Sequence, residues 1–182
     1  INNRTDAWGG SIENRARIHL EIIKRCRQEV GEDFPISVKL NSADFQKGGF
    51  SPDESIKVAQ MLENAGVDII EISGGTYEQP KLIGVEASIN AKRSEKRKES
   101  TIAREAYFLE YAQDIRKAVS IPLMVTGGFR TREGINDALQ SNVCQIVGIG
   151  RPLCADPYCI KKMLSGELET LPSFEKTLSL GP

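Results

Sequence analysis

Apolar side chains recur at helical spacing in the first part of the chain. The stretch 11–31 begins with Ser11, a good N-cap residue, and ends at Gly31, whose backbone freedom suits a helix terminus. Its apolar positions lie three or four residues apart, at Ile12, Ala16, Leu20, Ile23 and Cys26. A second helix is predicted over 51–65, because its Ser-Pro-Asp-Glu opening supplies a cap and a first-turn proline.

Short apolar segments alternate with the helical stretches. Four of them have the length and composition of strands: 36–41, 67–73, 121–126 and 145–150. Helices are predicted at three further places: 103–119, 131–139 and near 157–164. The irregular segment 74–100 contains a mixed-charge run at 92–100, which we expect to be a solvated surface loop.

The order of these elements favours an α/β fold. Strands that each lead into a helix pair in parallel through right-handed crossovers. A complete eight-unit barrel takes about 250 residues, whereas this chain has 182 residues and four visible units. We therefore expect a single partial domain over 1–182, the C-terminal half of a (β/α)8 TIM barrel with its N-terminal half absent. On the pattern alone, a small doubly wound open sheet is the competing fold.

The first two predicted strands alternate between apolar and polar side chains. Lys39 falls on the polar face of one strand and Glu71 on the corresponding face of the next, so the two could pair across neighbouring strands. This pair is either a structural ion pair of the barrel interior or a means of presenting a fixed positive charge to an electron-rich ligand atom. Ile69 and Val125 are also expected to face inward.

Glycines follow the third and fourth predicted strands. Gly127 and Gly128 come directly after one strand, and Gly150 precedes Arg151 at the end of the other. Glycine lets backbone N–H groups approach an anion, a following helix N-terminus adds a positive dipole, and arginine adds a bidentate donor. The pattern indicates a phosphate site, although each glycine pair taken singly is also compatible with an ordinary turn.

Composition excludes several classes of function. Lys and Arg number 24 against 25 Asp and Glu, a net charge of −1, so no nucleic-acid partner is expected. No apolar run approaches the ~20 residues that span a bilayer, and the N-terminus lacks a signal-peptide pattern, so we expect a cytoplasmic protein without membrane contact. The polar, loop-like start at Ile1 leads us to expect further sequence before it.

The remaining reactive side chains indicate no metal site. His19 is the single histidine and lies within the first predicted helix as a structural or surface residue, which argues against hydrolase triads and histidine-rich metal centres. The four cysteines show no Cys-x-x-Cys spacing, and the last three are expected to pack beside the final strand and helix: Cys144, Cys154 and Cys159. Arg4 and Asp6 are expected to anchor the opening turn.

A set of ordered motifs resembles a known family. The opening NRTD, WGGS and ENR are followed in order by VKLN, DIIEISGG, AREAYFLEYA, PLMVTGGFRT and VGIGRPL. Together they resemble the old yellow enzyme family of FMN-dependent NADH:flavin oxidoreductases over nearly the whole chain. The resemblance favours the barrel over the open sheet, because that family folds as an eight-unit barrel with FMN at the carboxyl ends of its strands.

The resemblance implies roles for five residues. Lys39 falls where the family places a basic residue beside the N1 and C2-carbonyl edge of the flavin, where it stabilises negative charge on the reduced ring. Gly127, Gly128, Gly150 and Arg151 fall where the family binds the FMN phosphate. The family's substrate-binding pair and its tyrosine proton donor precede the opening motif and have no counterpart here, so no catalytic residue is assigned.

Two hypotheses about function follow. The first is an oxidoreductase that passes reducing equivalents from NADH or NADPH through FMN to a small molecule, expected to be an activated alkene, with this chain supplying the flavin-phosphate half. The second is a non-catalytic half barrel that folds only by self-association or by pairing with the missing N-terminal half. A phosphate-binding lyase or isomerase barrel is a further alternative. The cysteine cluster that holds an iron–sulfur centre in longer relatives is not found in this sequence, in which four residues separate Cys154 from Cys159.

Overall fold

A parallel sheet organises the computed structural model, which describes residues 2–44, 47–73, 109 and 111–173. Its strands are β1 (Ser37–Asn41), β2 (Ile69–Ser73), β3 (Leu123–Thr126) and β4 (Ile146–Gly148). Its named helices are α1 (Ile12–Val30), α2 (Pro52–Asn64), α5 (Arg132–Gln140), α6 (Arg151–Ala155) and α7 (Cys159–Leu164). Residues 111–118 are also helical.

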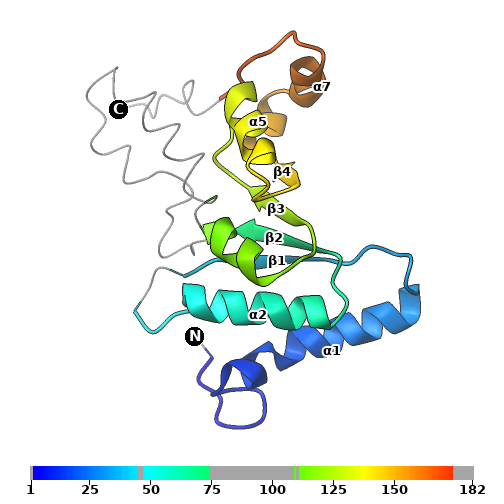
Figure 1. Ribbon diagram of the computed structural model, residues 1–182, viewed down its shortest axis with the longest axis vertical. Coiled ribbons are helices and arrows are strands. Elements are labelled where there is room, and N and C mark those ends of the chain that lie inside the picture. The colour runs from blue at the N-terminus through cyan, green and yellow to red at the C-terminus, as the bar shows by residue number, and fades with distance from the viewer. Residues whose placement is uncertain (1, 45–46, 74–108, 110, 174–182) are drawn as a thin grey trace, which may run out of the picture.

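The four strands lie side by side in chain order, β1-β2-β3-β4, and every pairing is parallel. This order is what successive strand-helix units produce when each crossover returns to the next position in the sheet. Figure 1 shows α1 and α2 side by side along the β1 end of the sheet, with α5 near β3 and β4. The predicted α/β fold with parallel strands is therefore confirmed.

One face of the sheet is buried under helices. Ile70 and Ile72 of β2 and Leu123 and Val125 of β3 are fully buried on this face. They form one core with apolar side chains from the helices: Ala16, Ile23, Val58, Ala59, Leu62, Ala112, Ile115 and Ala138. The opposite face carries Lys39 and Glu71, so alternation along the strands separates an apolar helix-covered face from a polar one.

The helix termini follow the capping signals in the sequence. Ser11 caps α1 by accepting a bond from the Asn14 N–H, and Gly31 ends it with a φ of 79°. Ser51 and Glu54 form a reciprocal capping box at the start of α2, which satisfies two backbone donors that the helix itself leaves unpaired. The predicted helices over 11–31 and 51–65 are confirmed.

Several expectations need correction. Val125 does not face inward: its register partners are Ile72 and Val147, and its side chain lies in the helix-covered core, so Met124 and Thr126 face the other way. The segment 121–126 is continuously apolar up to its last residue, so its sequence gave no alternation from which to read the facing. Of the three late cysteines, Cys144 and Cys159 are buried as expected, but Cys154 is exposed.

Other differences concern boundaries and coverage. The strands are one to three residues shorter at their ends than predicted, and a short helix, α6, follows β4 directly before α7. The segment 74–100, with its charged run 92–100, lies outside the described residues, as does most of 103–110. His19 lies exposed on α1, and Arg4 pairs with Asp6, as expected. No helix in the described part of the chain has the length and apolarity to cross a membrane.

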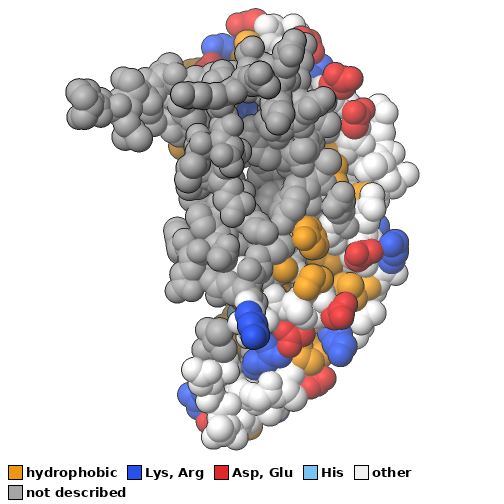
Figure 2. Space-filling view, turned by 90° about the vertical axis from the view of Figure 1, so that its left-hand side faces the viewer, with side chains coloured by type: hydrophobic (Ala, Val, Ile, Leu, Met, Phe, Trp, Pro, Cys, Tyr) orange, Lys and Arg blue, Asp and Glu red, His pale blue; other side chains and the backbone are white. Residues whose placement is uncertain are grey.

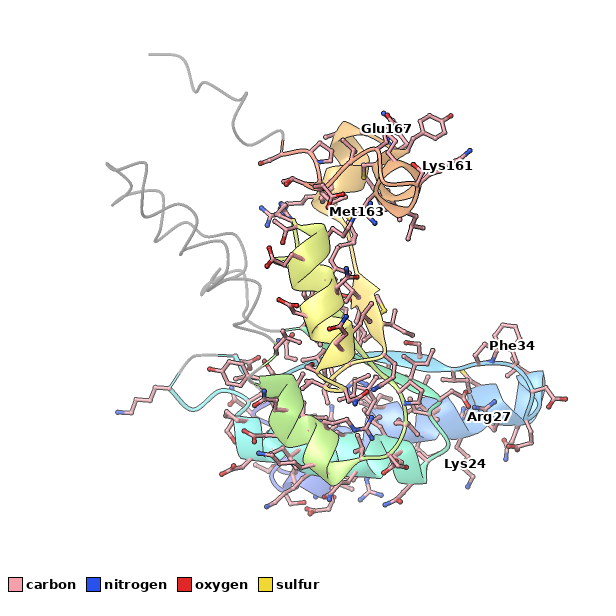
Figure 3. All side chains as sticks on the ribbon, turned by 45° about the horizontal axis from the view of Figure 1, so that its top comes forward. Lys24, Arg27, Phe34, Lys161, Met163 and Glu167 are labelled. Carbon is pink, nitrogen blue, oxygen red and sulfur yellow. The ribbon has the colours of Figure 1, made fainter. Side chains whose placement is uncertain are left out.

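Arg27 forms several hydrogen bonds at the end of the sheet where the strands begin. Its guanidinium donates to the carbonyl oxygens of Gly31 and Phe34 at 2.9 and 2.7 Å and to that of Gly66 at 2.7 Å. It also pairs with the Asp68 carboxylate at 2.6 Å, and its side chain is only 12% exposed. Figure 3 shows Arg27 near Phe34, at this end of the molecule. A single planar cation thus joins the end of α1 to the loops that precede β1 and β2.

The Asp68 carboxylate completes this cluster. It accepts the backbone N–H of Ile36 at 2.7 Å, and this bond together with the Arg27 guanidinium holds the pKa of Asp68 below its ordinary value. Because the folded-state pKa is lowered, the interaction stabilises the fold above the ordinary carboxylate pKa of about 3.9. That contribution is lost as the pH falls through the folded-state pKa.

We predict that Arg27→Ala lowers the free energy of unfolding by about 2 kcal/mol or more, because it removes a charged donor from several acceptors at once. Arg27→Lys should recover only part of the loss, since an ammonium lacks the planar fork. Urea denaturation measures the effect, with Lys24→Ala as the control: Lys24 is exposed on the same helix, and its loss should stay within about 0.5 kcal/mol. If the two variants lost equal free energy of unfolding, the hydrogen bonds of Arg27 to these loops would not stabilise the fold.

Candidate functional site

Parallel pairing brings the carboxyl ends of all four strands to one edge of the sheet. Two glycine-containing loops lie next to each other at this edge, one after β3 and one after β4. The Gly127 N–H donates to the Gly148 carbonyl at 3.4 Å, so the two loops begin in register. The structure thus brings together Gly127 and Gly128 with Gly150 and Arg151, as two neighbouring loops.

The loop after β3 requires glycine for conformational reasons. Gly127 has a φ of 109° and Gly128 a φ of 87°, values that L side chains rarely adopt. Two consecutive residues of this kind turn the chain sharply and leave their peptide groups without covering side chains. Phe129, which follows, is almost fully buried and anchors the loop against the core.

The loop after β4 has space above its glycine. A Cβ built on Gly150 would meet no atom within 4 Å, and Gly150 is exposed as the N-cap residue of α6. Its φ of −115° does not demand glycine, so neither backbone strain nor neighbouring atoms explain the missing side chain. Arg151, the first residue of α6, is half-buried beside it. This arrangement suits the close approach of a ligand to the backbone.

The helix dipole contributes less to this site than the sequence indicated. α6 spans five residues, and α5 begins at Arg132 with its own cap from Thr131, which accepts the Gly134 N–H. The macrodipole acts mainly within the first turn of a helix and grows with aligned peptide units. Any anion at this edge would therefore be held mainly by backbone N–H groups and by Arg151.

Lys39 lies in the middle of β1, the strand farthest from β4 in the sheet order. It stands in β1, in direct register with Glu71 of β2, and its Nζ is 2.9 Å from the Glu71 Oε1 atom. The Lys39 side chain is 57% exposed, whereas the Glu71 side chain is 19% exposed. The ion pair expected from the alternation of both strands is confirmed, and it faces away from the helices.

A row of short polar side chains follows Lys39 and Glu71 on the same face of the sheet, two residues nearer the carboxyl ends of the strands. The Ser73 hydroxyl donates to the Asn41 side-chain oxygen at 2.9 Å, and the Asn41 amide donates to Asp44 at 3.2 Å. Thr126 belongs to β3 at the same level, and its register partner in β4 is Gly148. Of this row, Ser73 is only 6% exposed.

Thr126 packs directly onto Gly148. A Cβ at Gly148 would lie 1.9 Å from the Thr126 hydroxyl oxygen and 2.8 Å from its Cβ, so this strand position accepts only glycine. The hydroxyl itself is buried and has no hydrogen-bond partner among the residues that the structure describes. Buried hydroxyls are normally satisfied, so an unpaired one beside the glycine loops indicates that a polar partner belongs nearby.

In the described residues, the groups with shifted pKa values lie outside the two glycine loops. The Arg15 guanidinium lowers the pKa of Glu54 at the start of α2, and burial raises the pKa of the Cys144 thiol behind β4. Ser120, together with backbone N–H groups, lowers the pKa of Glu63 at the end of α2. These groups take part in capping and in packing of the core.

The donor set at the strand ends fits an anionic cofactor. Paired glycine loops, an open approach above Gly150 and an adjacent arginine are features that bind phosphate. No group of three or more His, Cys, Asp or Glu side chains in the described ranges is arranged to hold a metal ion. Sequence reasoning did not identify Gly148 and Thr126 as partners, since their contact depends on the β3–β4 register; a glycine within a short strand was the available signal.

Comparisons with known proteins give consistent results. A family model described as "NADH:flavin oxidoreductase / NADH oxidase family" matches residues 1–169. The chain is 37% identical over 168 residues to NADH-dependent flavin oxidoreductase iliE of Hypocrea jecorina (strain QM6a), covering 90% of this chain and 39% of that protein. The chain therefore spans well under half the length of this relative.

Two solved structures share the fold. A 2-naphthoyl-CoA reductase in complex with 2-naphthoyl-CoA matches with a TM-score of 0.76 and 33% identity over 93% of this chain and 24% of its own. An old yellow enzyme homologue from Zymomonas mobilis matches with a TM-score of 0.64 and 22% identity, covering all of this chain and 45% of its own. The second likeness concerns the fold alone and agrees with the partial barrel expected from the sequence.

We predict that Gly148→Ala lowers the free energy of unfolding by roughly 1–3 kcal/mol, because the added methyl group would overlap Thr126 in the sheet. Gly150→Ala is the matched control, since its added methyl group meets open space, and its effect should stay within about 0.5 kcal/mol. Chemical denaturation of both variants checks this. Equal destabilisation would contradict the close packing of Thr126 on Gly148.

Proposed function

The chain belongs to the NADH:flavin oxidoreductase / NADH oxidase family, and from this premise we propose that it forms the flavin-phosphate half of an FMN-dependent oxidoreductase. In this proposal residues 1–182 form one partial barrel domain. The protein as a whole would take reducing equivalents from NADH, or from NADPH, and deliver them to a small-molecule substrate.

One observation carries the proposal: two glycine loops on neighbouring parallel strands lie at one sheet edge with an arginine beside them. Gly127 and Gly128 adopt φ values that L side chains rarely reach, and Gly150 has open space at its Cβ position. In eight-stranded barrels the loops after the last two strands commonly bind phosphate. We therefore assign the FMN phosphate to the Arg151 guanidinium and to backbone N–H groups of these loops other than that of Gly127, which donates to the Gly148 carbonyl.

Lys39 would act on the flavin ring from β1, on the side of the sheet away from the two glycine loops. FMN, when bound, supplies the redox chemistry between the nicotinamide and the substrate. The role of Lys39 is to place a positive charge near the ring, so that negative charge gained on reduction is stabilised. Its exposed ammonium, on the polar face of β1, is accessible for this contact.

For the substrate we propose an activated alkene. Support comes from the family resemblance and from the solved relative that is a 2-naphthoyl-CoA reductase in complex with 2-naphthoyl-CoA. The groups that would bind the substrate and donate a proton have no assigned counterpart among the residues of this chain. They would come from further strand-helix units, so the catalytic residues are not assigned here.

Two surfaces support association with such units. β1 and β4 end the sheet order, so each presents an edge that a closed barrel would pair. α1 also presents an outward apolar stripe at four-residue spacing, made of Ile18, Ile22, Cys26 and Val30, all exposed. Figure 2, which views the molecule from the strand-end side, shows further hydrophobic side chains at the surface among charged ones. We propose that an N-terminal half barrel, or a second copy, covers these surfaces.

We predict that Arg151→Ala weakens the binding of FMN far more than that of riboflavin, which lacks the phosphate. The loss should correspond to about 1.5–3 kcal/mol, the usual contribution of a charge-assisted hydrogen bond. Titrations of the flavin-free protein with both ligands measure the difference. Lys161→Ala, which removes an exposed positive charge from α7, is the control and should leave both affinities unchanged. If Arg151→Ala weakened the affinity for FMN and for riboflavin equally, Arg151 would support the fold rather than bind the phosphate.

We further predict that the 182-residue chain alone self-associates or aggregates, binds FMN weakly and does not reduce an enone. Its open sheet edges and the apolar stripe of α1 are the physical reason. Light scattering after size-exclusion chromatography, with an FMN titration, tests this. Co-expression with an N-terminal half barrel of a relative should restore flavin binding and turnover. A monodisperse monomer that binds FMN tightly and reduces an enone unaided would contradict the proposal.

A further inference from the structure

The pair between Lys39 and Glu71 is asymmetric. The two residues are direct cross-strand neighbours, with 2.9 Å between Nζ and Oε1. The lysine is 57% exposed, whereas the glutamate is 19% exposed. Loss of the glutamate would leave a solvated ammonium, but loss of the lysine would leave a largely desolvated carboxylate. The carboxylate therefore depends on the lysine more than the lysine depends on it.

The described residues around Glu71 offer its carboxylate no other charged partner. Its register partner on the other side is Met124, and the next residue in the same layer is Ile146, so the layer is apolar beyond the ion pair. The hydroxyl of Ser73, two residues along on the same face, donates to Asn41 rather than to Glu71. Lys39 is thus the only cation recorded against Glu71 in the part of the chain that the structure describes.

We infer that Glu71 is a positioning and charge-balancing residue for Lys39: it holds the ammonium at the polar face of the sheet and offsets its charge. The inference rests on the proposed function, in which Lys39 lies beside the flavin ring. There, an unbalanced lysine would favour the reduced, more negative flavin strongly. The paired carboxylate reduces this preference and so sets the flavin midpoint potential at a lower value.

This role predicts changes of opposite sign for the two partners. Glu71→Gln leaves the positive charge of Lys39 unbalanced, so the midpoint potential should rise. Lys39→Met leaves the negative charge of Glu71 unbalanced, so the potential should fall. The double variant removes both charges and should lie between the single variants, close to the parent protein. A purely structural ion pair predicts lower stability in the single variants without these opposite shifts.

The test is a spectroelectrochemical titration of the flavin-loaded protein, obtained by co-expression with an N-terminal half barrel of a relative, and of these three variants in the same form. We expect each single variant to change the ratio of affinities for reduced and oxidised flavin about tenfold, which is ~30 mV for a two-electron couple. Glu29→Gln is the matched control: it removes one negative charge from an exposed position on α1 and should leave the potential unchanged. Glu71→Asp keeps the charge on a shorter side chain and should give a smaller rise than Glu71→Gln.

A second readout does not depend on flavin. A double-variant cycle in urea denaturation of the flavin-free protein should show coupling between Lys39 and Glu71, with Lys39→Met the more destabilising single change. If Lys39→Met lowers the potential but neither Glu71 variant raises it, the inference about Glu71 is wrong and the proposed function stands. If the parent protein co-expressed with the N-terminal half barrel binds no flavin, or if Lys39→Met leaves the potential unchanged, the placement of Lys39 beside the flavin fails, and the inference fails with it.

Discussion

Parallel pairing of four consecutive strands is the constraint on which the rest of the structure depends. It places every strand terminus of one kind at the same edge, so loops that are far apart in the sequence become neighbours. The register then decides which side chains share a layer: Lys39 meets Glu71, and Thr126 meets Gly148. A shift of one residue would exchange the apolar and polar faces and remove both contacts.

The two ends of the sheet, where the strands begin and where they end, have different roles. At the edge where strands begin, Arg27 and Asp68 join the end of α1 to the loops before β1 and β2, and these contacts are short, partly buried and rigid. At the edge where strands end, Gly127 and Gly128 adopt positive φ values and Gly150 has open space at its Cβ position. This division agrees with the general rule for such barrels, in which one face stabilises and the other carries chemistry.

Local signals in the sequence predicted much of the fold. Caps at Ser11 and Ser51 are visible in the sequence because they depend on residues within one turn, and the alternation of 36–41 and 67–73 predicted the pairing of Lys39 with Glu71. The facing of Val125 was predicted wrongly, because a continuously apolar strand shows no alternation. The five-residue helix α6 was missed, since so short an element has too few positions to show a period.

Long-range contacts could not be predicted in the same way. Arg27 reaches Asp68 across 41 positions, and the packing of Thr126 on Gly148 appears only once the strands are in register. For the site, the sequence indicated the glycine loops and Arg151 but also a helix dipole that the short α6 supports poorly. The glycine loops and Arg151 are the residues to which we assign the flavin phosphate.

A crystal structure of the protein with FMN bound tests the central claim most directly. The account predicts phosphate density between the loop at Gly127 and Gly128 and the loop at Gly150 and Arg151, with backbone N–H groups within hydrogen-bonding distance. The flavin ring should then lie toward Lys39 along the same sheet edge. A phosphate bound elsewhere, with these two loops in contact only with solvent or protein, would contradict the account.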